Sequence, residues 1–176
     1  MSTAGQSGSF SPSGLLPKIK EKKFGIVYAQ WHEEIINSLV TGAEKILSEF
    51  GIPEANITKR SVPGSFELPL GAYYLSKFAK ADAVICIGCV VKGETPHFHY
   101  ICDAVANHIM QLSSVHNKPF IFGVLTVDTM EQATERAGGK HGNKGEEAAL
   151  AALQMLQLKE ELSTPKQGGQ LGFSKF

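Results

Sequence analysis

The apolar run from Ala83 to Val91 constrains the fold of this chain more than any other feature. A strand that is apolar on both faces needs cover on both faces, which is typical of a parallel sheet between two layers of helices. Further β-rich runs lie at residues 24–30, 56–62 and 120–127, and the last of them is also apolar on both faces. Helical spacing of apolar residues follows the first three strands, at residues 33–50, 66–79 and 98–112. After the fourth strand, Asp128 or Thr129 is the candidate cap of a short helix that ends near Ala137, and an Ala/Leu-rich helix follows at 146–159.

This alternation predicts an α/β domain of three layers, in which a four-stranded parallel sheet carries helices on both faces. Ligands bind such sheets beyond the carboxyl ends of the strands. The segments that follow the first three strands hold the unusual residues of the chain, at 31–32, 63–67 and 92–97. We therefore expect the functional site at this edge of the sheet.

The segment after Val91 has the composition of an anion site with a base beside it. Thr95 is the candidate N-cap of the next helix, and Pro96 is its candidate first residue. A helix N-terminus presents unpaired backbone N–H groups and the positive end of the helix dipole, which both favour an anion. His97 follows at once and is a candidate general acid or base. The alternative is a histidine with only a structural role.

Three other residues have both a structural and a functional interpretation. Trp31, the only tryptophan, either packs at the entry to a helix or stacks on a heteroaromatic ring. Glu67 either complements a helix dipole or accepts hydrogen bonds from ligand hydroxyls. Arg136 either complements the C-terminus of its helix or binds a phosphate through its guanidinium. The residues by themselves leave these alternatives open.

The cysteines and histidines are not expected to form a metal site. Cys86 and Cys89 are three apart in an expected strand, so they point to opposite faces and resemble small buried apolar residues. His97 and His99 are two apart at a helix start, do not share a helical face, and have no nearby set of ligands to complete a zinc site. The glycine-rich loop at 138–145 lacks the Gly-Lys-Ser/Thr ending of a nucleotide-binding P-loop.

The composition excludes several classes of protein. The 17 basic and 17 acidic side chains cancel, so nucleic-acid binding has no electrostatic support. Three cysteines in apolar surroundings indicate reduced thiols rather than a secreted disulfide framework. No run is long and apolar enough to span a membrane, and no secretory signal is visible. We expect a cytoplasmic protein with neither a nucleic-acid nor a membrane partner.

The two ends of the chain differ in composition from the part between them. Residues 1–14 are mostly Ser, Gly and Pro and are expected to be disordered or loosely attached. Residues 15–160 are expected to form a single domain, long enough to bury a core without disulfides or metal. Residues 161–176 are expected to form a C-terminal tail, in which Leu171, Phe173 and Phe176 either dock on a surface or are mobile.

Several motifs occur together in one order along the chain. They are Phe24-Gly25-Ile26-Val27 with Trp31, Val62-Pro63-Gly64-Ser65-Phe66-Glu67-Leu68-Pro69, residues 88–98, Ile121-Phe122-Gly123-Val124-Leu125, and residues 131–138 with Gly142-Asn143-Lys144-Gly145. Over residues 14–159 this set resembles the 6,7-dimethyl-8-ribityllumazine synthases, which act in the penultimate step of riboflavin biosynthesis. The resemblance implies a flavodoxin-like fold and a transferase. It implies two small-molecule substrates and neither a metal nor an organic cofactor.

The resemblance also implies a role for each matched residue. His97 is implied to be the catalytic acid or base. The pyrimidine and its ribityl chain are implied to contact Trp31, Ser65, Phe66, Glu67, Cys89, Val90, Val91 and Phe122. The phosphate of the second substrate is implied to contact Glu94, Thr95 and Arg136. Lys144 is a further candidate contact of the pyrimidine.

Members of this family form homopentamers whose active sites lie between adjacent subunits, so Phe122 and Arg136 are expected to complete a neighbour's site. Some members assemble twelve pentamers into an icosahedral shell, and the short link at 138–145 resembles that of shell-forming members. The N-terminal segment is a candidate to pair with a neighbouring subunit. The alternatives are a non-catalytic flavin- or lumazine-binding protein and a structural shell protein. The complete set of matched residues favours the enzyme.

Overall fold

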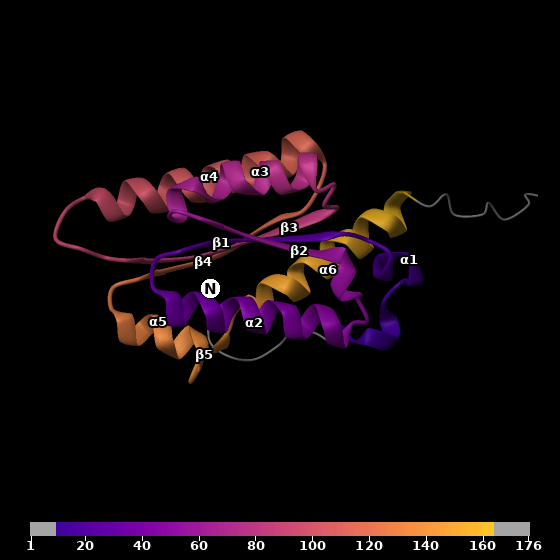
Figure 1. Ribbon diagram of the computed structural model, residues 1–176, viewed down its shortest axis with the longest axis horizontal. Coiled ribbons are helices and arrows are strands. Elements are labelled where there is room, and N and C mark those ends of the chain that lie inside the picture. Colours follow the sequence, from indigo (N-terminus) through magenta and orange to yellow (C-terminus); the bar gives the residue numbers. More distant parts are fainter. Residues whose placement is uncertain (1–9, 164–176) are drawn as a thin grey trace, which may run out of the picture.

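Four parallel strands form the middle layer of the structure, a computed structural model that describes residues 10–163 of the 176-residue chain. The strands are β1 (Phe24–Ala29), β2 (Ile57–Val62), β3 (Ala83–Val91) and β4 (Phe120–Val127), and their order across the sheet is β2-β1-β3-β4. Helices cover both faces of this sheet (Figure 1). The predicted three-layer α/β fold with a four-stranded parallel sheet is confirmed.

The register of the sheet brings the ends of three strands to one edge. Ala29 at the end of β1 pairs with Val62 at the end of β2, and Tyr28 pairs with Ile87 of β3. The chain runs from β1 to β2 on one side and on to β3 on the other side of β1. This reversal makes the carboxyl edge beside β1 the switch point of the sheet, where α/β proteins place their ligands.

One face of the sheet is covered by α3 (Leu68–Phe78) and α4 (His97–His116) (Figure 1). Their apolar side chains, among them Leu75 and Ile109, form one core with the side chains of the strands that point to this face. Gly71 allows α3 to lie close to the sheet, because a Cβ there would be 2.7 Å from Val62 and 2.8 Å from Val27. This face therefore carries the helix that starts at His97.

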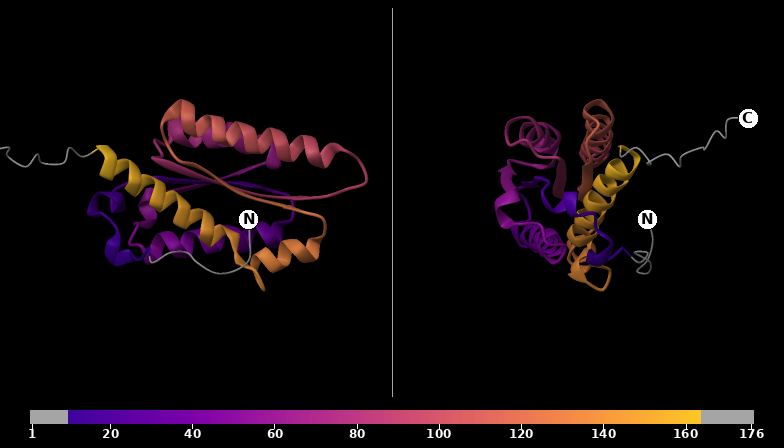
Figure 2. Two further views of the ribbon diagram at one scale, coloured as in Figure 1. Left: turned by 180° about the vertical axis from the view of Figure 1, so that it is seen from behind. Right: turned by 90° about the vertical axis from the view of Figure 1, so that its right-hand side faces the viewer.

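The opposite face is covered by α2 (Glu33–Glu49), α5 (Met130–Arg136) and α6 (Lys144–Ser163). Figure 2 shows α6 crossing this face obliquely to α2. The two helices lie in close contact at Gly145, where a Cβ would be only 1.9 Å from the carbonyl oxygen of Leu39. Leu39, Leu47 and Leu153 are fully buried in the core between them.

Some elements differ from those that the sequence predicts. The prediction that β4 is buried on both faces is wrong, because β4 is an edge strand and Phe122 is 41% exposed. The last helix begins two residues before position 146 and continues past position 159 to Ser163. The hairpin of β5 (Ala137–Gly139) and β6 (Gly142–Asn143) and the short helix α1 (Pro17–Lys20) have no counterpart among the predicted elements. Within residues 10–163, no helix has both the length and the apolar character needed to cross a membrane.

Residues 10–14 pack against the rest of the chain. The ring of Phe10 stacks on that of Phe50, with centroids 5.2 Å apart, and Pro12–Gly14 form a 3₁₀ turn. The side-chain amide of Gln157 donates to the carbonyl oxygen of Gly14 at 3.2 Å. This part of the expected N-terminal extension is therefore attached, while residues 1–9 and the tail with Leu171, Phe173 and Phe176 lie outside the described residues. The domain limits of 15 and 160 stay a prediction.

Candidate active site

The side chains of Trp31 and Glu67 both lie beside Gly64, beyond the ends of β1 and β2. A Cβ built on Gly64 would lie 3.2 Å from Oε2 of Glu67 and 3.7 Å from Nε1 of Trp31. The indole is 69% exposed, so Trp31 is not a core residue of this chain. The next residue, His32, has a left-handed backbone with φ of 62° and starts α2, a conformation that histidine tolerates better than most residues. An exposed aromatic face beside a carboxylate suits a polar heteroaromatic ligand.

The turn before α3 separates two neighbouring side chains. Residues Ser65–Glu67 form a 3₁₀ turn, in which Ser65 is buried and Phe66 is 58% exposed. The hydroxyl of Ser65 points at Gly88 of β3, which has no side chain to obstruct it. Glu67 is the N-cap of α3 but makes no capping hydrogen bond through its side chain. Its carboxylate therefore lies near the positive end of α3 without closing that end.

The end of β3 presents Cys89, Val90 and Val91, of which Cys89 is buried and the two valines are half-buried. Cys86 belongs to the core under α3 and α4, and Cys89 belongs to the core on the other face, so their predicted opposite orientation is confirmed. Burial raises the pKa of the Cys89 thiol to about 11 and also raises the pKa of Cys86. Both thiols are therefore protonated at neutral pH. Within residues 10–163, no three side chains of His, Cys, Asp or Glu gather closely enough to hold a metal ion.

The N-terminus of α4 is uncapped and lies in an exposed loop. The helix begins at His97, so Pro96 is the N-cap, and the prediction that Thr95 caps it is wrong. The first turn is instead closed by a 3₁₀-type bond from the His99 N–H to the Pro96 carbonyl at 3.0 Å. Glu94, Thr95 and His97 are all exposed. The backbone N–H groups of His97 and Phe98 are thus available to an anion, with the His97 imidazole beside them.

Arg136 and His97 lie on helices that cover opposite faces of the sheet (Figure 1). The Arg136 guanidinium donates from Nη1 to the Gln132 carbonyl at 3.0 Å, and Lys144 on the same face pairs with Glu147 at 2.5 Å. Phe122 pairs with Cys86 near the amino end of β4 rather than at the carboxyl edge. One chain thus brings Trp31, residues 65–67 and 89–91 and His97 to one edge, and it leaves Phe122, Arg136 and Lys144 apart from them.

Two capping residues near Arg136, Gln132 and Asn143, are not among the functional residues that the sequence predicts. Gln132 donates its backbone N–H to Thr129 Oγ1 at 3.3 Å and accepts the Asp128 N–H at 2.9 Å through its side chain. Asn143 accepts the N–H groups of the first turn of α6. Both starts carry a readable signature, Thr129-x-x-Gln132 and Asn143-x-x-Glu146, which are capping-box spacings. Of the two predicted candidates for the cap of α5, Asp128 and Thr129, the structure selects Thr129.

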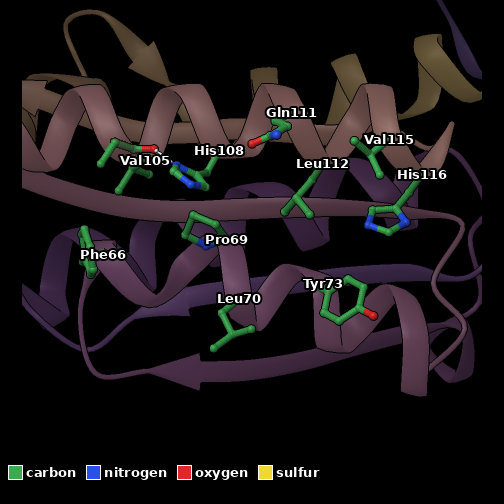
Figure 3. Close-up of a pocket in the computed structure, with 11 residues that line it drawn as sticks. Phe66, Pro69, Leu70, Tyr73, Val105, His108, Gln111, Leu112, Val115 and His116 are labelled. Atoms are coloured by element: carbon green, nitrogen blue, oxygen red, sulfur yellow. Dashed lines mark hydrogen bonds between the residues drawn. The ribbon is translucent and has the colours of Figure 1, made fainter.

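Phe66 also borders an apolar groove of about 470 Å³ between α3 and α4. Figure 3 shows side chains of the two helices facing one another across it, with Leu70 and Tyr73 on α3 and Leu112 on α4. Its lining includes neither Trp31 nor His97, so the groove shares only Phe66 with the residues described above at the carboxyl edge. An apolar surface of this kind is typical of a face that another protein molecule covers.

Known proteins of one family are similar to this chain over most of its length. The model of the family described as 6,7-dimethyl-8-ribityllumazine synthase matches residues 21–160. A protein of that name from Cytophaga hutchinsonii is 54% identical over 156 residues, which cover 89% of this chain and 98% of the relative. Proteins of the same name from Porphyromonas gingivalis (51% identical over 143 residues, 81% of this chain and 89% of the relative) and Parabacteroides distasonis (46% over 156 residues, 89% and 98%) are also similar. The matched region contains every residue of the carboxyl edge described above.

Proposed function

Because the chain belongs to the 6,7-dimethyl-8-ribityllumazine synthase family, we propose that it catalyses that family's condensation at the carboxyl edge of its sheet. It is an enzyme, a transferase. It joins 5-amino-6-(D-ribitylamino)uracil to 3,4-dihydroxy-2-butanone 4-phosphate and releases 6,7-dimethyl-8-ribityllumazine, phosphate and water. The observation that carries the proposal is the convergence of Trp31, residues 65–67 and His97 beyond three adjacent strands.

The pyrimidine substrate binds beyond β1 and β2 in this proposal. The exposed indole of Trp31 stacks on the pyrimidine ring, and Glu67 and Ser65 form hydrogen bonds with the ribityl hydroxyls. Phe66 and the backbone of residues 89–91 bound the same slot. The support is the exposure of the indole and its position beside Gly64, where the Glu67 carboxylate also lies.

The phosphate of the second substrate binds at the start of α4. Glu94 and Thr95 belong to the loop that surrounds it, and the uncapped N–H groups of α4 face it. Arg136 of an adjacent subunit supplies the positive charge, because a guanidinium binds a phosphate through two parallel hydrogen bonds. This arrangement is supported by the exposure of the loop and by the absence, among residues 10–163, of a side chain that caps α4.

The reaction needs a group that transfers a proton and groups that bind the leaving phosphate. The amine of the pyrimidine forms a Schiff base with the ketone, phosphate leaves by elimination, and ring closure completes the product. His97 removes the carbon-bound proton that the elimination requires, while the N–H groups of α4 and Arg136 stabilise the departing phosphate. Holding two substrates together supplies much of the remaining rate enhancement.

The same proposal requires a homo-oligomer in which Phe122 and Arg136 complete the site of a neighbour. Its support is the position of both residues away from His97 in one chain. A stripe on the outer side of α3 and the turn before it is also strongly exposed for apolar residues: Phe66 58%, Leu70 53%, Tyr74 49% and Phe78 69%. We infer a pentamer that buries this stripe, and twelve pentamers in an icosahedral shell. The cytoplasm is the inferred location, because Cys86, Cys89 and Cys102 are free thiols.

Two experiments test these statements. The purified protein is incubated with both substrates, and the lumazine chromophore is followed against reactions that lack protein or either substrate. Product that forms only at the uncatalysed rate would favour a binding or shell protein. Sedimentation velocity separates the assemblies, because a monomer, a pentamer and a sixty-subunit shell differ greatly in size. A species no larger than a pentamer would reject the shell.

A further inference from the structure

Ser38 and Asn143 connect three elements on the face of the sheet that carries Arg136. The Asn143 amide donates from Nδ2 to the Ser38 carbonyl at 2.9 Å, and its Oδ1 accepts the N–H groups of Gly145 at 2.8 Å and Glu146 at 3.3 Å. The Ser38 hydroxyl donates to the carbonyl oxygen of Ala137. Two side chains thus join α2, the β5–β6 hairpin and the start of α6. We call this pair the Ser38–Asn143 clamp.

The Asn143 side chain of the clamp packs tightly against the backbone of α2. A Cβ on Gly42 would lie 2.6 Å from the side chain of Asn143, so the amide sits directly on the backbone of α2. Gly145 likewise has no room for a side chain against Leu39. Both polar ends of the Asn143 amide are hydrogen-bonded, so the amide has one preferred orientation.

The clamp fixes the backbone of the residues that adjoin two cationic side chains, Arg136 and Lys144. Ala137 directly follows Arg136 and pairs with Asn143 in the hairpin, and Lys144 directly follows Asn143. Among residues 10–163, the Arg136 side chain bonds only within its own short helix, to the Gln132 carbonyl. The direction in which its guanidinium projects therefore depends on how the end of α5 is fixed to α2 and α6.

We propose that Ser38 and Asn143 are positioning residues of the reaction. They hold the end of α5 in place, so that the Arg136 guanidinium reaches the substrate phosphate in the adjacent subunit. This inference rests on the proposed function of Arg136. It predicts a selective loss: weakening the clamp should impair binding of the phosphate-bearing substrate and spare the pyrimidine. A clamp that only joined α6 to α2 would change stability and affect neither substrate selectively.

The test is Ser38→Ala, because removing one hydroxyl leaves the Asn143 cap and the helix in place. Ser113→Ala is a matched control: the Ser113 hydroxyl also joins a helix to another segment, since it accepts the Phe120 N–H at 3.0 Å and lies 3.2 Å from the Phe120 carbonyl, at the amino end of the sheet. Loss of one such bond should raise KM for the phosphate-bearing substrate about three- to tenfold in Ser38→Ala. The KM for the pyrimidine should change less than twofold, and Ser113→Ala should leave both values within twofold.

Making Ser38→Ala in an Arg136→Gln variant distinguishes an effect on the position of Arg136 from an effect on the stability of the fold. Ser38→Ala should add nothing to the KM defect of Arg136→Gln, because both changes remove the same contact. Inorganic phosphate, titrated calorimetrically into the full-length protein, should bind Ser38→Ala more weakly by the same factor as the KM change. An unchanged phosphate affinity, or an equal effect of Ser38→Ala in the Arg136→Gln background, would overturn the clamp. A wild-type protein that forms no lumazine would instead refute the proposed function, and the phosphate titration would still decide the clamp.

Discussion

Ser65 and Gly88 pack so closely that β3 accepts no side chain at position 88. A Cβ there would lie 2.8 Å from the Ser65 hydroxyl oxygen, 2.9 Å from Leu68 Cδ1 and 3.2 Å from Val124 Cγ1. None of these atoms is the far end of a long flexible side chain, and Ser65 and Leu68 are buried. The contact therefore fixes the turn that carries Phe66 and Glu67 against the end of β3.

Gly88→Ala should move this turn. We expect the free energy of unfolding to fall by about 1–3 kcal/mol, as for other substitutions that overpack a core. We also expect KM for the pyrimidine to rise, because Ser65 and Glu67 move together. Gly93→Ala is the matched control, since a Cβ there meets nothing within 4 Å. Urea unfolding and steady-state kinetics measure both effects, and a destabilised Gly88→Ala with wild-type KM would separate the turn from the pyrimidine site.

His97→Ala should lower kcat and leave both KM values nearly unchanged. A positioned proton carrier contributes about 10²- to 10⁴-fold to a rate, so we expect a loss in that range rather than inactivity. His99→Ala is the control, because His99 is also exposed and lies two residues further along α4, on a different side of the helix. Complete inactivity would mean that His97 does more than move a proton, and full activity would remove it from the mechanism.

A site shared between subunits should allow two impaired variants to restore one another's activity. His97→Ala and Arg136→Gln are unfolded together and refolded as a mixture. If one site takes His97 from one subunit and Arg136 from the next, about a quarter of the sites in a random ring contain both wild-type residues. Activity should therefore appear after joint refolding and not after mixing of the folded variants. No recovery in either case would place both residues in the same subunit's site.

The cysteines should react slowly in the folded protein. Burial raises the pKa of all three thiols, with Cys89 at about 11, and the thiolate is the reactive form. We expect Cys102, which is half-buried, to react first with a disulfide reagent at pH 8, and all three to react rapidly in denaturant. Reaction of Cys86 or Cys89 at the denatured rate in the folded protein would contradict the buried positions of these two residues.

The parts of the structure that the sequence predicted depend on local patterns. The run from Ala83 to Val91 predicted a covered strand, and its two cysteines predicted opposite faces, because both follow from the two-residue period of a strand. The order of the strands is not local, so β4 was not recognisable as an edge strand from its apolar composition. The separation of Arg136 from His97 is of the same kind, since it depends on which face each helix covers. The start of α4 differed for a smaller reason, a turn closed by Pro96 instead of by Thr95.

The ion pair of Lys22 and Glu160 should make stability depend on pH at both ends of the scale. Lys22 Nζ lies 2.6 Å from Glu160 Oε1, with side chains 27% and 19% exposed, and it ties the segment before β1 to the last turns of α6. The hydrogen bond from Lys22 is the main cause that lowers the pKa of Glu160 below its ordinary value of 4.5, and Lys18 and Lys159 lower it further. The same bond raises the pKa of Lys22 above 10.5.

The directions of the pKa shifts of Glu160 and Lys22 define the pH range in which the ion pair stabilises the fold. A lowered carboxyl pKa contributes stability that is present above the ordinary value and is lost as pH falls through the folded value, and a raised lysine pKa contributes stability that is lost as pH rises through the folded value. Lys22→Met should therefore unfold at lower urea than wild type between about pH 5 and pH 10, and the difference should shrink outside that window. Lys45→Met is the control, because the Lys45–Glu146 pair is longer, at 3.0 Å, and more exposed, so its loss should cost less. A Lys22→Met deficit that stays constant from pH 3 to pH 8 would show that the side chain stabilises by packing rather than by its charge.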